Sequence, residues 1–262
     1  MYTAPVSSDI IGARADKPAA GGKVMTVSFL KKRQQRRLLV GIAGSGIYMI
    51  VYWLIAATGA GSEKIGTAAN AAFRNMAMWR FEAAAWLCVI AISGIYVGAM
   101  ELVNISREAE VTGNKTSHYM GKMFRVGIMA LVVLYLGRAL LNCLFPMVYR
   151  LVYKSSNDEV LAAQITNGAA DRIRLPVMLA ILVMDLFPSV VWYYMVLQKR
   201  ISVPVYGVIF TPLSMMVIGY CIRLIPTQFT ADFTAAFEPF GWLLMMYGAY
   251  MHTRSRVSSI PQ

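Results

Sequence analysis

The sequence predicts an all-α membrane protein, a bundle of six transmembrane helices with both termini in the cytoplasm. Three observations lead to this fold class. The first is composition, because 58% of the 262 residues are apolar and only 15% are charged, whereas soluble domains contain about 45–50% apolar and about 25% charged residues. The second is the presence of six long apolar runs, and the third is the uneven distribution of Lys and Arg between them.

The six apolar runs define the spans. A helix needs about 20 apolar residues to cross about 30 Å of hydrocarbon. The runs that meet this requirement are residues 38–59, 81–103, 126–149, 175–197, 201–224 and 233–251, the last being the shortest. Residues 1–30 are expected to form a disordered cytoplasmic tail, since they are mostly polar and show no periodicity. The transmembrane domain is expected over residues 31–253, followed by a short cytoplasmic tail over residues 254–262.

Basic residues give the orientation. Residues 31–37 hold five cations directly before the first apolar run, and in the six-span arrangement sixteen Lys and Arg residues lie on the N-terminal side against seven on the other. Cytoplasmic loops carry an excess of Lys and Arg. The pattern therefore predicts a multi-pass protein of the cell (plasma) membrane with the N-terminus and C-terminus in the cytoplasm. It also accounts for the net charge of +12 without a nucleic-acid partner.

An arginine lies near the middle of the third run. Placing Arg138 at the bilayer centre costs roughly 3 to more than 10 kcal/mol before pairing, so we expect a partner for it inside the bundle. Asp185 in the fourth run lies at a similar depth from the cytoplasmic side, and we predict that Arg138 and Asp185 form an ion pair, with Asn142 one turn away on the same helix face. Such a pair either locks two helices together or forms a polar centre for a ligand or protons.

A second candidate site lies near the outer face. The second and sixth runs share the pattern F-E-x-x-x-W-L, at residues 81–87 and 237–243. Parallel repeats of this kind occur in transporters, although a match this short also arises by chance. Glu82 and Glu238, with Arg223 at the end of the fifth run, are predicted either to form a polar pocket open to the outside or to contact headgroups and water.

Two outer loops are expected to contain short helices. Residues 61–80 place Ile65, Ala69, Phe73 and Met76 at helical spacing, which predicts a helix lying on the membrane surface. The pattern Ser156 to Glu159 resembles a capping box, and Asn167 with Gly168 resembles a stop signal, so a second helix of about ten residues is predicted between them.

Motifs for catalysis, metals and cofactors are missing from the sequence. The patterns HExxH, GxSxG and GxxxxGK[ST] do not occur. The three cysteines, Cys88, Cys143 and Cys221, are widely separated, and the only two histidines are His118 and His252. We therefore expect no catalytic residues, no metal and no cofactor.

The last third of the chain resembles a known family. The residues that carry the resemblance are Val203-Pro204-Val205-Tyr206, Thr211-Pro212-Leu213 and Leu224-Ile225-Pro226, followed by a last span that contains Gly241. They are similar to a family of uncharacterised bacterial multi-span membrane proteins, a domain of unknown function. The resemblance implies a membrane location and a helical fold, and no particular chemistry.

Three classes of function stay open at this point. The protein could bind or transport a small or lipid-like molecule among Arg138, Asp185, Asn142, Glu82, Glu238 and Arg223. It could instead be a structural or regulatory membrane subunit whose buried charges only specify helix packing. An intramembrane enzyme acting on lipid is the least supported class. The lipid bilayer is an expected partner in all three classes.

Overall fold

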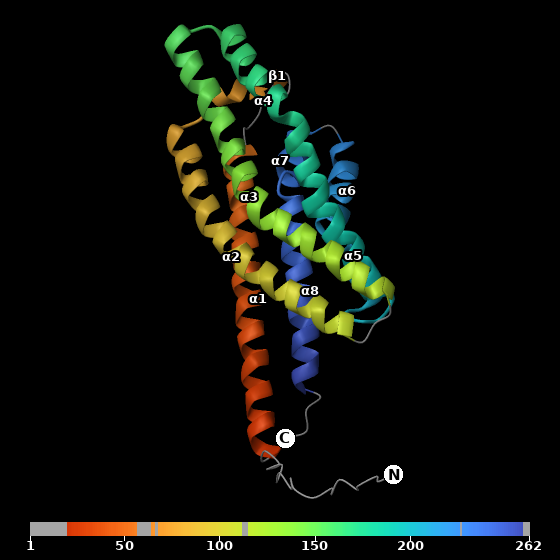
Figure 1. The fold of residues 1–262 in the computed structure, drawn as a ribbon. Coiled ribbons are helices and arrows are strands. Elements are labelled where there is room, and N and C mark those ends of the chain that lie inside the picture. The colour runs from red at the N-terminus through yellow and green to blue at the C-terminus, as the bar shows by residue number, and fades with distance from the viewer. Residues whose placement is uncertain (1–19, 57–63, 66–67, 112–114, 226, 259–262) are drawn as a thin grey trace, which may run out of the picture.

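Four long helices form the body of the protein, as a computed structural model shows (Figure 1). The structure describes residues 20–56, 64–65, 68–111, 115–225 and 227–258. The long helices are α1 (Ala20–Ala56), α2 (Met78–Val111), α3 (Lys115–Ser156) and the continuous run α4 (Glu159–Ile181), η2 (Leu182–Leu186) and α5 (Phe187–Leu197). All four are long and apolar enough to cross a membrane, which confirms the prediction of an all-α membrane protein.

Helix α1 begins at Ala20 and so extends into the segment predicted as a tail, while residues 1–19 lie outside the described part of the chain. The predicted first run ends at residue 59, whereas α1 ends at Ala56 and residues 57–59 are not described. Helix α8 (Phe237–Ser258) likewise runs past residue 253. The start of α1 and the end of α8 lie at the same end of the bundle (Figure 1).

Helices α1 and α2 pack through glycines at close range. A Cβ atom added to Gly41 would lie 2.7 Å from the Cα atom of Gly98, and one added to Gly44 would lie 2.6 Å from the carbonyl oxygen of Ala91. Small residues allow the backbones of membrane helices to approach in this way. At the N-terminal end of the pair, Arg37 of α1 forms a 2.6 Å ion pair with the buried carboxylate of Glu101 of α2.

At the end of the bundle opposite the start of α1, the structure differs from the two predicted loop helices. The strands β1 (Lys64–Ile65) and β2 (Ala69–Asn70) pair as a small hairpin, and the 3₁₀-helix η1 (Ala71–Arg74) follows. The surface helix predicted there is wrong, but Ala69, Phe73 and Met76 are buried as its apolar face required. They pack against α3 and α4 in a separate small core, which explains why periodic apolar residues need not form a helix here.

The second predicted loop helix is part of a longer one. Asp158, not Ser156, caps α4 by accepting hydrogen bonds from the backbone N–H groups of Val160 and Leu161. The helix continues through Asn167 and Gly168. Instead of ending the helix, the Asn167 side chain accepts hydrogen bonds from the N–H groups of Ala68 and Ala69 and so holds the hairpin against α4.

The fifth predicted span is not a continuous helix. Residues 201–204 are irregular, η3 (Val205–Ile209) is a 3₁₀-helix, and only α6 (Pro212–Arg223) is α-helical. A continuous helix over residues 201–224 is therefore not formed, because only residues 212–223 are α-helical. Pro204 and Pro212 lack an N–H group and fix φ, and both proline positions coincide with the start of a new element.

Side chains of α5 satisfy the polar groups of this irregular segment. The indole of Trp192 donates to the carbonyl oxygen of Gly207 at 2.9 Å, and the hydroxyl of Tyr193 lies 3.0 Å from that of Thr211. The hydroxyl of Ser189 accepts from the N–H group of Leu213. Irregular backbone at membrane depth is tolerated where protein surrounds it, and α5 on one side and α8 on the other provide those surroundings.

The last part of the chain consists of two helices. A short helix, α7 (Gln228–Thr234), precedes α8, and α8 runs antiparallel to α1 through the centre of the bundle (Figure 1). The sixth span, predicted from residue 233, thus begins as a helix at Phe237. The residues before it belong to α7, which is separated from α8 by a short turn at Ala235 and Ala236.

Gly44 and Gly46 offer a matched test of the α1–α2 contact. Gly44→Ala is expected to destabilise the protein by about 1–3 kcal/mol, because its methyl group would press on the α2 backbone. In Gly46→Ala, no atom lies closer than 4.0 Å to the new methyl group. This variant is expected to be neutral or slightly more stable, since alanine has a higher helix propensity than glycine. Thermal unfolding in detergent measures both, and equal effects of the two variants would contradict the close packing.

Candidate functional site

A buried ion pair joins α3 to the start of α8. The guanidinium of Arg138 donates two parallel hydrogen bonds to the carboxylate of Glu238, each 2.5 Å long. The side chains are 15% and 6% exposed. Two-pronged arginine–carboxylate pairs are among the strongest charged hydrogen bonds, and Glu238 lies in the first turn of α8, where the helix dipole favours a negative charge. These two effects offset the cost of placing Arg138 inside the bundle.

The partner of Arg138 is therefore Glu238, and not Asp185, which was predicted from its similar depth in the membrane. Asp185 lies close enough to interact electrostatically with Arg138, but its oxygen Oδ1 accepts a 3.1 Å hydrogen bond from the indole of Trp242 instead. The predicted Arg138–Asp185 ion pair is wrong. The sequence placed Glu238 near the outer face, whereas α7 occupies that region and α8 begins at the depth of Arg138.

The two F-E-x-x-x-W-L segments have different environments. Glu238 and Trp242 are buried, at 6% and 0% exposure, whereas Glu82 is exposed and Trp86 is 74% exposed. The predicted outer pocket between Glu82, Glu238 and Arg223 is not formed. Because the two motifs face opposite environments, the likeness between them does not correspond to equivalent positions in the fold.

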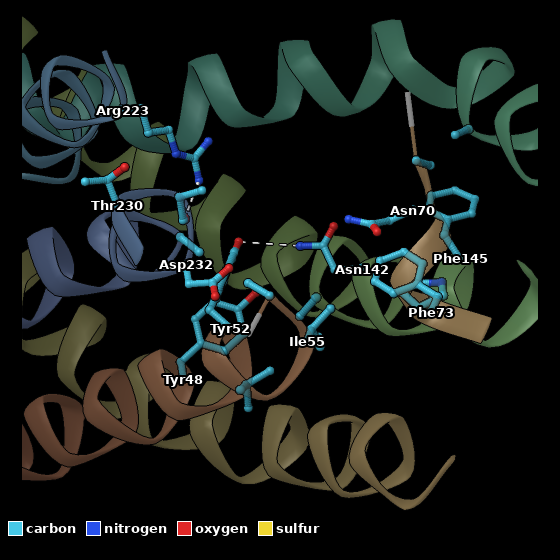
Figure 2. Close-up of a pocket in the computed structure, with 18 of the residues that line it drawn as sticks. Tyr48, Tyr52, Ile55, Asn70, Phe73, Asn142, Phe145, Arg223, Thr230 and Asp232 are labelled. Atoms are coloured by element: carbon cyan, nitrogen blue, oxygen red, sulfur yellow. Dashed lines mark hydrogen bonds between the residues drawn. The ribbon is translucent and has the colours of Figure 1, made fainter. Parts of the chain in front are cut away.

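A cavity of about 700 Å³ lies beside the ion pair, toward the end of the bundle that carries the β1–β2 hairpin. Its walls come from α1, α3, α4, α6, α7 and the hairpin before η1 (Figure 2). Ala139, the neighbour of Arg138, and Ala235, three residues before Glu238, line it. The ion pair is therefore close behind the inner wall of the cavity.

The cavity has a charged end, near which Tyr48 and Tyr52 also lie, and an end with two phenylalanine rings (Figure 2). Figure 2 shows Arg223, Thr230 and Asp232 on one side and Phe73 and Phe145 on the other. Arg223 is held by a 2.7 Å hydrogen bond from its Nε atom to the hydroxyl of Thr234. Charges of both signs at one end and aromatic rings at the other suit an amphipathic molecule.

Asn142 connects the cavity to α1. Its amide nitrogen donates a 3.5 Å hydrogen bond to the hydroxyl of Tyr52 across the cavity (Figure 2). This position agrees with the expectation that Asn142 shares a face with Arg138. Five of the six candidate residues thus lie in or near the cavity. Asn142 and Arg223 line it, and the charged centre beside it contains Arg138, Glu238 and Asp185. Glu82 lies apart from them on an exposed face.

Several residues of this region were not singled out from the sequence. Tyr48 and Tyr52 of α1 line the cavity, Tyr135 of α3 lies one turn before Arg138, and Trp242 bonds to Asp185. A signal existed for the first two, since tyrosine hydroxyls spaced i and i+4 in the middle of an apolar run share one helix face. Asp232 gave no such signal, because only the fold of α7 brings it to the cavity.

A metal centre finds no support in the described part of the chain, where no group of three or more His, Cys, Asp or Glu side chains could hold an ion. Cys88 and Cys143 are buried and Cys221 is exposed, all three as free thiols.

The fold and the site define an all-α membrane protein with a charged centre and a neighbouring cavity. The chain belongs to a family of unknown function, DUF6796, whose model matches residues 25–256. This match confirms the resemblance to an uncharacterised family noted from the fifth and sixth runs. No curated protein and no solved structure matches the chain significantly.

The ion pair can be tested with a double-mutant cycle. Arg138→Gln and Glu238→Gln are each expected to destabilise the protein by about 3–5 kcal/mol, because each leaves an unpaired buried charge. The double variant should lose much less unfolding free energy than the sum of the two single losses. Unfolding in mixed micelles measures all four proteins.

The control cycle combines Arg138→Gln with Glu82→Gln, which neutralises an exposed carboxylate elsewhere. Those two changes should be additive, as expected for distant sites. Additive effects of Arg138→Gln and Glu238→Gln would contradict the ion pair.

Proposed function

We propose that this protein binds a small amphipathic or lipid-like molecule in the cavity between α1, α3, α4, α6 and α7. The observation that carries the proposal is the 700 Å³ cavity beside the buried Arg138–Glu238 pair. Ligand sites typically have volumes of about 300–1,000 Å³, mostly apolar walls and a few placed polar groups. Binding, with or without transport, is the function that such a cavity in a membrane bundle supports best.

The chemical character of the walls supports an amphipathic ligand. At the polar end, Arg223 and Asp232 can meet a polar or zwitterionic headgroup, and Asn142 adds an amide farther inside. At the other end, Phe73, Phe145 and Ile55 offer an apolar surface for a chain. A ligand with both parts would match this order of side chains.

A second candidate function is a structural or regulatory subunit. The observation that favours it is that Arg138 and Glu238 already satisfy each other through two hydrogen bonds, so that the charges can serve packing alone. Under this alternative, filling the cavity would change stability and nothing else.

Filling the cavity separates the two functions. Ala235→Phe places a ring in the cavity, and Ala169→Phe places the same ring on the exposed face of α4, outside the cavity lining. Native mass spectrometry would detect co-purified lipids and the uptake of an added fluorescent lysophospholipid. We expect wild type and Ala169→Phe to retain a bound molecule and Ala235→Phe to lose it at unchanged thermal stability. Equal retention by all three proteins would favour the structural subunit.

The same proposal includes six crossings of the plasma membrane with both termini in the cytoplasm. It is supported by the four long apolar helices, by the shared end of α1 and α8, and by the excess of Lys and Arg on that side. The segment 201–223 and α8 would then complete the fifth and sixth crossings.

Cysteine labelling tests this topology. In a variant whose three native cysteines are replaced, Ser155→Cys at the α3–α4 turn should react with a membrane-impermeant maleimide from outside intact cells. Arg254→Cys in the last turns of α8 should react only after the membrane is permeabilised. Labelling of Arg254→Cys in intact cells would contradict a cytoplasmic C-terminus and indicate the opposite orientation.

A further inference from the structure

The buried charges beside the cavity do not balance. Arg138 provides one positive charge, whereas Glu238 and Asp185 provide two carboxyl groups, and Asp185 is only 2% exposed. An uncompensated charge in an apolar interior is strongly disfavoured, so a buried group of this kind takes up a proton instead. One guanidinium and two carboxyls are neutral together when they hold one proton between them.

The hydrogen bonds indicate which carboxyl carries that proton. Glu238 receives two charged N–H donors from Arg138. Asp185 receives one neutral donor, the indole of Trp242, on Oδ1, and its Oδ2 has no hydrogen-bond partner among the described residues. An ionised carboxylate can accept about four hydrogen bonds. Asp185 is therefore the poorly solvated group of the two and the better place for the proton.

Asp185 shares its surroundings with one cation, Arg138, and one further carboxyl, Glu238. The titratable groups that interact with it are Arg138 and Tyr135 of α3, Glu238 of α8 and Tyr52 of α1. Asp185 itself lies in the π-helical turn η2, three residues before Pro188, and π-helical turns are frequent at functional sites.

Two further buried hydroxyls lie in the same region as Asp185, which interacts electrostatically with Tyr135. The phenol oxygens of Tyr135 and Tyr48 are buried and, within the described residues, have no hydrogen-bond partner. Their rings are in contact, with centroids 4.8 Å apart, and Tyr48 lines the cavity. A phenol hydroxyl both donates and accepts hydrogen bonds, so the hydroxyls of Tyr135 and Tyr48 are chemically able to pass a proton on.

We propose that Asp185 is a proton-binding site, protonated on Oδ2 at neutral pH, that exchanges its proton with water in the cavity by way of Tyr135 and Tyr48. The O–H bond of the carboxyl breaks when the proton moves to water, and the resulting carboxylate shares the positive charge of Arg138 with Glu238. This inference rests on the proposed function only in that the cavity is the place where the proton enters and leaves.

Infrared spectroscopy of the purified full-length protein in lipid tests the assignment directly. Wild type at neutral pH is expected to show the C=O stretching band of a protonated carboxyl, and this band should shift in heavy water. Asp185→Asn, whose amide oxygen can still accept from Trp242, should lack the band. Glu82→Gln, which removes an exposed carboxyl, should retain it. A wild-type spectrum without the band would overturn the proposal.

Two further measurements distinguish the bound proton from a bound metal cation and from a folding defect of the variant. If a monovalent cation occupied the position instead, the band would appear only after sodium and potassium are removed, and that result would also overturn the proposal. If Asp185→Asn fails to fold, Trp242→Phe serves in its place. Loss of the indole donor should move the band to higher frequency, and an unmoved band would assign the protonated carboxyl elsewhere.

The route is tested by the rate of exchange. Tyr135→Phe and Tyr48→Phe should slow the heavy-water shift of the band several-fold, while Tyr96→Phe on the exposed face of α2 should not. Unchanged rates in both cavity-side variants would overturn the route. The band is measured without added ligand. If wild type binds lysophospholipid but shows no carboxyl band, the result contradicts the proton site alone. The reverse result contradicts the proposed function alone.

Discussion

The ion pair between Arg138 and Glu238 is the interaction on which the interior of this bundle depends. An arginine in the middle of a membrane helix is tolerated only with a partner, and the partner must reach it from another helix without bringing water. The start of α8 provides this, because its first turn offers both the carboxylate of Glu238 and the positive end of a helix dipole. Helix α8 therefore has to begin inside the bundle, at the depth of Arg138.

This position of α8 explains the arrangement of its neighbours. Since α8 begins deep, the chain turns back between α6 and α7, and α7 with the turn before α8 lines the cavity next to the start of α8. The close contact of Gly241 with Thr211 and Pro212 fixes α6 against α8 at the same level. A Cβ atom at Gly241 would lie 2.4 Å from the Cα atom of Pro212. The charged centre, the cavity and the broken fifth segment are thus parts of one arrangement.

The sequence allowed some of these features to be predicted and others not. The apolar face of residues 69–76 was expected and is buried, yet the backbone there forms a hairpin and a 3₁₀-helix, because burial of a spaced set of side chains does not require a helix. Arg138 was expected to have an acidic partner and does. Which carboxylate, Asp185 or Glu238, pairs with Arg138 depends on where α8 begins, and the packing of α7 decides that position.

By itself, the sequence determined that this chain is a helical membrane protein. Runs of about 20 apolar residues cannot be placed in water, and in a bilayer the backbone must satisfy its own hydrogen bonds, which leaves the helix as the solution. Only the tertiary structure decided that Glu238 is buried while Glu82, in the same local motif, is exposed. Local sequence sets which residues share a helix face, whereas the neighbours of that face, and hence the partner of each charge, follow from contacts between residues as far apart in the chain as Arg138 and Glu238.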